Sequence, residues 1–208
     1  MSALPLREIS REAINELPIR RYQGEVCLVA DAADLARAMA DIRAESVVGF
    51  DTETRPAFNK GEDHLPCLVQ VATARAVYLF QLRRVDCAAA LAELLAAPGI
   101  VKAGVALAHD LRQLKRLFPF AEAGVLDLGQ VARRQGIRQT GLRNLAAIFL
   151  GFRLAKGNRT SNWAAARLTP SQIDYAATDA WVGRELYLCL DRLGMPAPAN
   201  ASKPGTTP

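Results

Sequence analysis

The sequence predicts an α/β protein in which helices flank a mixed β-sheet, and three features indicate this fold class. Apolar runs of strand type follow one another closely in the first half of the chain, which favours antiparallel hairpins. Strand-like and helical segments then alternate, which is typical of parallel strands. The last third is helical and includes one long segment with clear start and stop signals.

The strands of the first half are indicated by β-branched and aromatic residues. A short strand over 25–29 precedes a helix that Asp31 can cap. Further strands are expected over 47–51, 67–72 and 76–80. Because the links between these three are short, we expect antiparallel pairing among them.

Helices alternate with a buried strand in the middle of the chain. Residues 86–97 read as a helix that ends before Pro98, residues 100–104 as a strand, and residues 107–118 as a helix stopped by Pro119. This alternation predicts parallel pairing in this half of the sheet.

The last third contains a helix over 142–150 and then a much longer one. Thr169 can serve as the N-cap of the long helix, Pro170 suits its first position, and Gln172 completes a capping box. Gly194 is the expected stop. The start of this helix is the best signalled boundary in the chain.

A length of 208 residues favours one domain. We expect residues 1–24 to form an N-terminal arm, 25–194 the folded domain, and 195–208 a disordered C-terminal tail rich in Pro, Ala, Ser and Thr. No run approaches the roughly 18 apolar residues of a membrane span, and the N-terminus is too charged for a secretory leader. The sequence therefore predicts a cytoplasmic protein without a membrane partner.

The numbers and spacing of cysteine and histidine limit the kinds of active site that this chain can form. The four cysteines are scattered without the spacing of a zinc site, and there are only two histidines. A histidine-rich metal site or a serine-histidine triad is therefore not expected. Any catalysis must depend on carboxylates.

Positive charge is concentrated in one stretch. The net charge is +5, but residues 128–173 hold eight of the 26 basic residues and none of the 21 acidic ones. Such a stretch favours a phosphate-rich partner. From composition alone, a solvated basic face without a ligand explains it equally well.

Two acidic residues lie at the C-terminal end of an apolar strand. Asp51 and Glu53 are two residues apart, so in extended backbone they face the same side. Carboxylates side by side repel each other, and a bound cation is the simplest way to neutralise them. Turns also favour acidic residues at strand ends, so this pair alone leaves both interpretations open.

Two later segments add three further candidates. Asp110 follows the strand at 100–104, where it can also be a helix N-cap. Tyr175 and Asp179 are four residues apart in the long helix, which places them on one face with small residues between them. Asp174, near the start of that helix, is expected to be an ordinary exposed acid.

Together, the segments GFDTETRP, AHDLRQL and SNWAAARLTPSQIDYAATDAW resemble the DEDDy 3'-5' exonucleases, and more closely their Werner-type and ribonuclease D-type exonuclease domains. The likeness covers roughly residues 25–193, and the DxE, D and YxxxD motifs occur in the family's order. The resemblance implies a ribonuclease H-like fold, an exonuclease domain over 25–194, and a metal-dependent hydrolase that cleaves phosphodiester bonds from the 3' end.

The resemblance also implies roles for five residues. Asp51, Glu53 and Asp179 would bind one divalent ion, and Asp51 would also contact a second ion that Asp110 supports. Tyr175 would orient the attacking water, and the product would be a nucleoside 5'-monophosphate. Oxygen ligands without histidine suit Mg²⁺ or Mn²⁺, so two such cations are the expected cofactors.

The expected partner is nucleic acid, as single-stranded or 3'-ended DNA or RNA, and the sequence leaves protein partners open. Lys156, Arg159 and Arg167 are candidates for backbone contacts, and Phe58 for contact with a terminal base. Trp163 is expected to be a packing anchor rather than a stacking platform.

Two alternatives and one departure from the family pattern remain. A ribonuclease H-like module that binds nucleic acid without cutting it would be expected to lack an acid, and all four are present here. A phosphoesterase for small nucleotides would not need the basic stretch. Thr54 stands where some relatives have tryptophan. This difference does not affect the metal site but leaves the shape of the surrounding groove open. His109 is expected to be structural.

Overall fold

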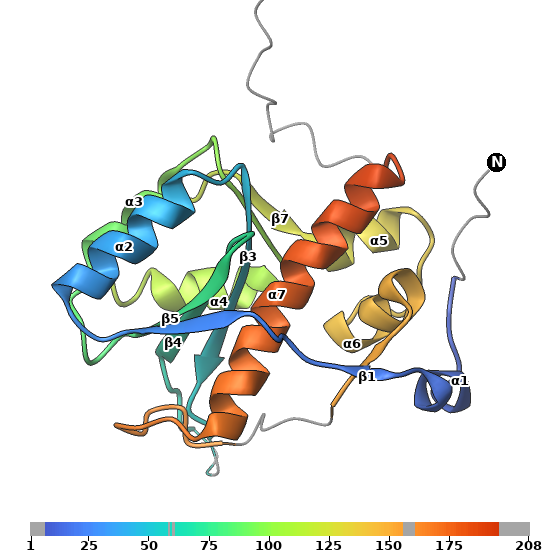
Figure 1. Ribbon diagram of the computed structural model, residues 1–208, viewed down its shortest axis with the longest axis horizontal. Coiled ribbons are helices and arrows are strands. Elements are labelled where there is room, and N and C mark those ends of the chain that lie inside the picture. The colour runs from blue at the N-terminus through green and yellow to red at the C-terminus, as the bar shows by residue number, and fades with distance from the viewer. Residues whose placement is uncertain (1–6, 58, 60, 156–160, 196–208) are drawn as a thin grey trace, which may run out of the picture.

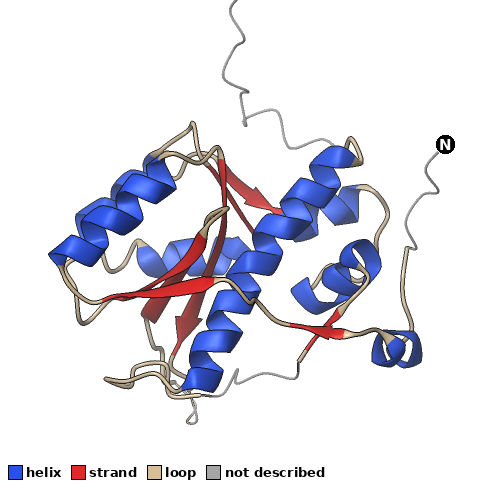
Figure 2. Cartoon of the chain, in the orientation of Figure 1, coloured by secondary structure: helices blue, strands red, loops and turns tan. Residues whose placement is uncertain are grey.

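The computed structural model describes residues 7–57, 59, 61–155 and 161–195. Figures 1 and 2 show a twisted mixed sheet with helices on both faces. Six strands form it, in the order β2-β5-β4-β3-β6-β7. They are β2 (Glu25–Val29), β3 (Val47–Thr54), β4 (Pro66–Ala72), β5 (Ala76–Gln81), β6 (Val101–Gly104) and β7 (Val125–Asp127). The predicted fold class is confirmed.

The pairing directions agree with those predicted. β3 and β4, and β4 and β5, are antiparallel, whereas β6 pairs in parallel with both β3 and β7. β2 pairs in parallel with β5 and forms one edge of the sheet. β3 runs as far as Thr54, three residues beyond the predicted end, so Glu53 belongs to the strand.

The helices divide between the two faces of the sheet. Helices α2, α3 and α4 pack on one face, and α5, α6 and α7 pack on the other. Their bounds are α2 (Ala32–Arg43), α3 (Ala88–Ala96), α4 (Leu107–Leu114), α5 (Leu128–Arg134), α6 (Leu142–Leu145) and α7 (Pro170–Arg192). Helix α7 has the expected capping box between Thr169 and Gln172.

Two α-helices are shorter in the structure than the sequence predicted. Helix α4 ends at Leu114, because residues 115–118 turn to bury Phe118 in the core. The expected helix over 142–150 is α-helical only in α6 and continues as a π-helical segment, η1 (Ala146–Leu150). Strand β7 and helix α5 were not predicted.

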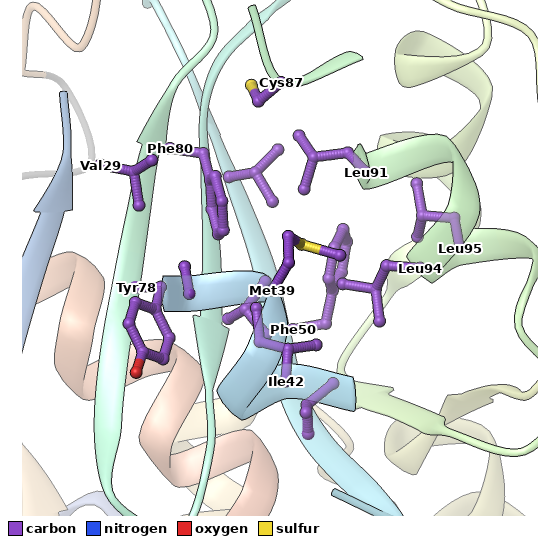
Figure 3. Close-up of a cluster of buried hydrophobic side chains, with 14 of the residues drawn as sticks. Val29, Met39, Ile42, Phe50, Tyr78, Phe80, Cys87, Leu91, Leu94 and Leu95 are labelled. Carbon is purple, nitrogen blue, oxygen red and sulfur yellow. The ribbon is translucent and has the colours of Figure 1, made fainter. Parts of the chain in front are cut away.

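The largest single cluster of buried side chains lies between the sheet and helices α2, α3 and α4. Figure 3 shows Phe50 of β3 beside Met39 and Ile42 of α2 and Leu94 of α3. Because side chains alternate along a strand, the inward direction of Phe50 sends its neighbour Asp51 to the opposite face, toward α7. The core on one face thus fixes the direction of the acidic residues on the other.

Helix α7 packs directly on the backbone of the sheet. A Cβ atom at Gly49 of β3 would lie 1.9 Å from the Ala180 carbonyl oxygen, and one at Gly183 would lie 2.9 Å from the Ala103 carbonyl oxygen. Ala176 and Ala177, on the same helix, are fully buried. Small residues on both partners therefore bring α7 close to β3, as its alanines predicted.

The N-terminal arm contains two short elements, α1 (Arg11–Glu16) and β1 (Ile19–Arg20), neither of them predicted. β1 pairs in parallel with β8 (Arg153–Leu154), which forms a separate two-stranded sheet. The expected tail beyond residue 195 lies outside the described residues. Among the described helices, none is long and apolar enough to cross a membrane.

Candidate active site

Three carboxylates meet between β3 and α7. Asp51 and Glu53 lie on the same face of β3, and Asp179 projects from α7. One carboxylate oxygen from each of the three lies within 4.8 Å of the other two. Asp179 is far from Asp51 and Glu53 in the sequence, and the close packing of α7 on the sheet brings it to them.

The register of β3 leaves space beside this cluster. β6 pairs with β3 only from Val47 to Gly49, so Asp51 and Glu53 extend beyond the last pair and have only β4 as a neighbouring strand. The chain leaves the end of β6 toward α4 at this point. The carboxylates therefore border an opening at the carboxyl end of β6 instead of a continuous sheet.

Asp110 approaches the cluster from α4. It lies in the first turn of that helix, but it is not the N-cap, which is Ala106 in the left-handed conformation with φ 62°. Burial raises the pKa of Asp110, and the nearby Thr52 side chain and the His109 charge oppose this rise. The charge of Asp110 in turn contributes to the raised pKa of Asp51, so the two side chains interact.

The Asp51 carboxyl is strongly affected by its surroundings. Burial raises its pKa well above the ordinary value, and the charges of Asp179 and Asp110 raise it further. Only a hydrogen bond from the Thr52 backbone opposes this rise among the described residues. A set of carboxylate oxygens that is partly buried and this close together fits a hard divalent cation such as Mg²⁺ or Mn²⁺.

Tyr175 lies one helical turn before Asp179, close enough for that carboxylate to raise the pKa of its hydroxyl. Burial, followed by the charges of Asp179 and Glu53, raises the pKa of Tyr175 above its ordinary value. Its ring packs at 5.9 Å, centroid to centroid, from the ring of Trp163. Trp163 is fully buried, so it is the packing anchor that the sequence indicated.

Other candidates lie away from the cluster or outside the described residues. Arg167 is exposed in the loop before α7. Phe58, Lys156 and Arg159 lie outside the part of the chain that the structure describes. Asp174 is exposed and 3.8 Å from Arg21 in an ion pair, which agrees with an ordinary surface role.

The carboxylates open into a pocket with a volume of about 740 Å³. Asp51, Tyr175 and Asp179 line part of it. Another part is lined by α6, including Arg143, and by the N-terminal arm, including Arg11. Sequence reasoning missed both arginines. Arg143 belongs to the acid-free stretch, but nothing in the local sequence of Arg11 indicated a place in this pocket.

Comparison with known proteins matches residues 26–194 to a family described as 3'-5' exonuclease. The mouse bifunctional 3'-5' exonuclease/ATP-dependent helicase WRN is 30% identical over 86% of this chain and 14% of its own length. Ribonuclease D of Gluconacetobacter diazotrophicus is 34% identical over 80% of this chain and 42% of its own. The chain thus spans less than half the length of these relatives.

Solved structures share the fold. The exonuclease domain of Aedes aegypti Nibbler superposes with a TM-score of 0.74 at 25% identity, covering 85% of this chain and 92% of that domain. Escherichia coli RNase D gives a TM-score of 0.71 at 22% identity, covering 82% of this chain and 46% of its own. Both are described as exonucleases or exoribonucleases, and the likeness extends over most of the chain.

Proposed function

Because the chain belongs to the 3'-5' exonuclease family, we propose that it removes nucleotides from the 3' end of a nucleic-acid strand and releases nucleoside 5'-monophosphates. The observation that carries this proposal is the meeting of Asp51, Glu53 and Asp179 within 4.8 Å. Asp51 and Asp179 line a pocket that also contains Tyr175. Residues 25–194 are the proposed catalytic unit.

Two divalent cations, Mg²⁺ or Mn²⁺, are the proposed cofactors. Asp51, Glu53 and Asp179 would hold one of them, and Asp51 and Asp110 would serve the other. When bound, such a pair stabilises the attacking and leaving oxygens of a phosphodiester displacement. The repulsion that raises the pKa of Asp51 supports this assignment, since a cation would relieve it.

Tyr175 has a positioning role in this proposal. Its raised pKa keeps the phenol protonated at neutral pH, so it does not act as a base. Its place one helical turn from Asp179 and the packing of its ring against Trp163 hold the hydroxyl near the carboxylates. From there it can orient a water molecule for attack on the scissile phosphorus.

The proposed substrate is single-stranded or 3'-ended DNA or RNA. One structural neighbour, the RNase D of Trypanosoma brucei, is described as a complex with RNA U12. In this chain, the acid-free stretch 128–173 supplies basic residues that suit a phosphate backbone, with Lys156, Arg159 and Arg167 as proposed contacts and Phe58 as a contact for the terminal base.

The test is degradation of 5'-labelled DNA and RNA oligomers with Mg²⁺ or Mn²⁺, with and without a chelator. We expect a ladder that shortens from the 3' end, with loss of cleavage on chelation. Asp51→Asn should lower the rate at least about 100-fold, because it removes a shared ligand of the metal site. Binding of both oligomers without cleavage by either metal would instead identify a non-catalytic module, and a preference for mononucleotides would identify a small-nucleotide phosphoesterase.

A further inference from the structure

The N-terminal arm forms part of the wall of the catalytic pocket. Ile9, Arg11, Ile14 and Asn15 all line the same pocket as the carboxylates of β3 and α7. They come from residues just before and within helix α1, which Figure 1 shows on the side of α6 away from the sheet. The pocket is therefore bounded by the N-terminal arm as well as by β3 and α7.

Specific contacts fix the arm to the rest of the molecule. The backbone N–H of Ile9 donates to Gln139 Oε1 at 2.8 Å, and the N–H of Arg138 donates to the Arg7 carbonyl at 3.1 Å. On the other side of α1, the N–H of Arg153 donates to the Pro18 carbonyl at 2.9 Å, where β1 pairs with β8. Helix α1 is thus held at both of its ends.

The acidic and the basic residues of the pocket wall come from different helices and strands. The carboxylates come from β3 and α7, whereas the basic residues among the described lining are Arg11 of α1 and Arg143 of α6. A phosphodiester bound with its cations needs both kinds of group, because the carboxylates hold the metal and the guanidinium groups bind phosphate oxygens. The arm supplies one of these two guanidinium groups.

Arg11 is available for such a contact. Its side chain is exposed, and beyond the electrostatic attraction of the neighbouring Glu12, no hydrogen bond or ion pair engages its guanidinium group among the described residues. Arg143 is already anchored, since its guanidinium group donates to the Leu154 carbonyl at 3.2 Å. Arg11 is therefore the better residue to test, because its substitution removes no structural contact.

We propose that the N-terminal arm is a substrate-binding element, in which Arg11, together with Arg143, binds a backbone phosphate of the strand whose 3' end reaches the carboxylates. This inference rests on the proposed exonuclease function. It adds a role for the N-terminal arm, for which the sequence indicated no function. The contact is to the backbone, so it holds the strand without selecting its bases.

The test compares two arginines of the arm, one that lines the pocket and one that does not. Arg11→Ala removes the pocket guanidinium group, and Arg7→Ala removes the same charge from a residue whose side chain does not line the pocket. Binding of a single-stranded oligomer is measured by fluorescence anisotropy at several salt concentrations, in an Asp51→Asn background so that cleavage cannot interfere. Thermal unfolding of each variant confirms that it is folded.

We expect Arg11→Ala to weaken binding about 3- to 10-fold and to reduce the slope of log affinity against log salt by about 0.7, the value for one phosphate contact on a single strand. In the active chain, the same substitution should raise KM more than it lowers kcat. Arg11→Lys, which keeps the charge but not the forked geometry, should recover part of the loss.

Equal losses for Arg11→Ala and Arg7→Ala would overturn the proposal, because they would reflect total charge and not the pocket. No loss for Arg11→Ala would overturn it as well. Failure of the proposed function has a different signature, since the natural chain would then not shorten oligomers from the 3' end at all, whatever residue stands at position 11.

Discussion

Asp51 shows how a single residue can favour function at a cost in stability. Its raised pKa means that the folded chain binds more protons at this site than the unfolded chain does. As pH rises from the unfolded pKa of about 4 through the raised folded value, this group therefore lowers the free energy of unfolding. Without a cation, the Asp51 carboxyl therefore contributes less to stability at neutral pH than it does below pH 4.

Replacing this carboxylate should reveal the effect directly. In the presence of a chelator, Asp51→Asn should raise the free energy of unfolding at neutral pH, because it removes the burial of a charge and the repulsion from Asp179 and Asp110. Mg²⁺ should stabilise the natural chain more than the variant. Thermal unfolding with chelator and with Mg²⁺ measures both effects, with Asp174→Asn on the exposed side of α7 as the control. A less stable Asp51→Asn protein under chelation would contradict the repulsion argument.

Lys102 gives a second prediction at the residue scale. It is fully buried in β6, where its Nζ donates to the Ala97 carbonyl at 2.6 Å, and burial lowers its pKa to about 8. Between this value and the ordinary 10.5, the unfolded chain binds more protons than the folded chain, so stability should rise with pH across this range.

The comparison that isolates Lys102 is urea unfolding of the natural chain and Lys102→Met at several pH values. From about pH 8 to about pH 10, the natural chain should gain roughly 2 kcal/mol relative to the variant. Below pH 8, the difference between them should be constant. A difference that stays constant over the whole range would mean that Lys102 keeps its ordinary pKa in the folded chain.

At the scale of elements, the packing of α7 on β3 determines whether the carboxylates meet. A methyl group at Gly49 would collide with the α7 backbone, which cannot move aside like a flexible side chain. Gly49→Ala should therefore cost about 2 kcal/mol or more of stability and move Asp179 away from Asp51. Gly99→Ala is the matched control, because a Cβ atom there meets nothing within 4 Å.

Both variants can be measured by chemical denaturation and by the rate of oligomer shortening. Gly49→Ala should lose stability and activity together, and Gly99→Ala should keep both. If Gly49→Ala is as stable and active as the natural chain, the close approach of α7 does not determine the geometry of the site.

The elements also show which features local sequence can predict. The two-residue spacing of Asp51 and Glu53 and the four-residue spacing of Tyr175 and Asp179 indicate shared faces, because strand and helix periods are fixed by backbone geometry. The pairing of β1 with β8 joins Ile19 to Arg153 and has no comparable local signal. The place of Arg11 in the pocket depends on that long-range pairing, so sequence reasoning could not find it.

The segment η1 shows the same limit in a helix. Its apolar residues continue the helical pattern of α6, so the sequence predicted one α-helix over 142–150. The change to π-helical hydrogen bonding depends on how the segment packs against α7 and the rest of the core, with Ala146 and Ala147 buried. Periodicity alone does not distinguish these two helix types over so short a stretch.

At the scale of the whole molecule, the two faces of the sheet differ in whether they carry the carboxylates. One face packs against α2, α3 and α4 without contributing carboxylates from β3, and the other both packs against α5, α6 and α7 and presents the carboxylates of β3. The arm and the acid-free stretch then border the same pocket with positive charge. This distribution fits a strand whose backbone lies along basic residues and whose 3' end enters the acidic cluster.

The most direct test of this account compares Asp179→Asn with Asp174→Asn, two equal charge changes five residues apart on α7. The rate of shortening of a 5'-labelled single-stranded oligomer is measured with Mg²⁺ and with Mn²⁺. The account predicts that Asp179→Asn loses at least about 100-fold in rate, while Asp174→Asn retains the natural rate within about twofold. Equal rates for the two variants would show that the cluster of Asp51, Glu53 and Asp179 is not the catalytic centre.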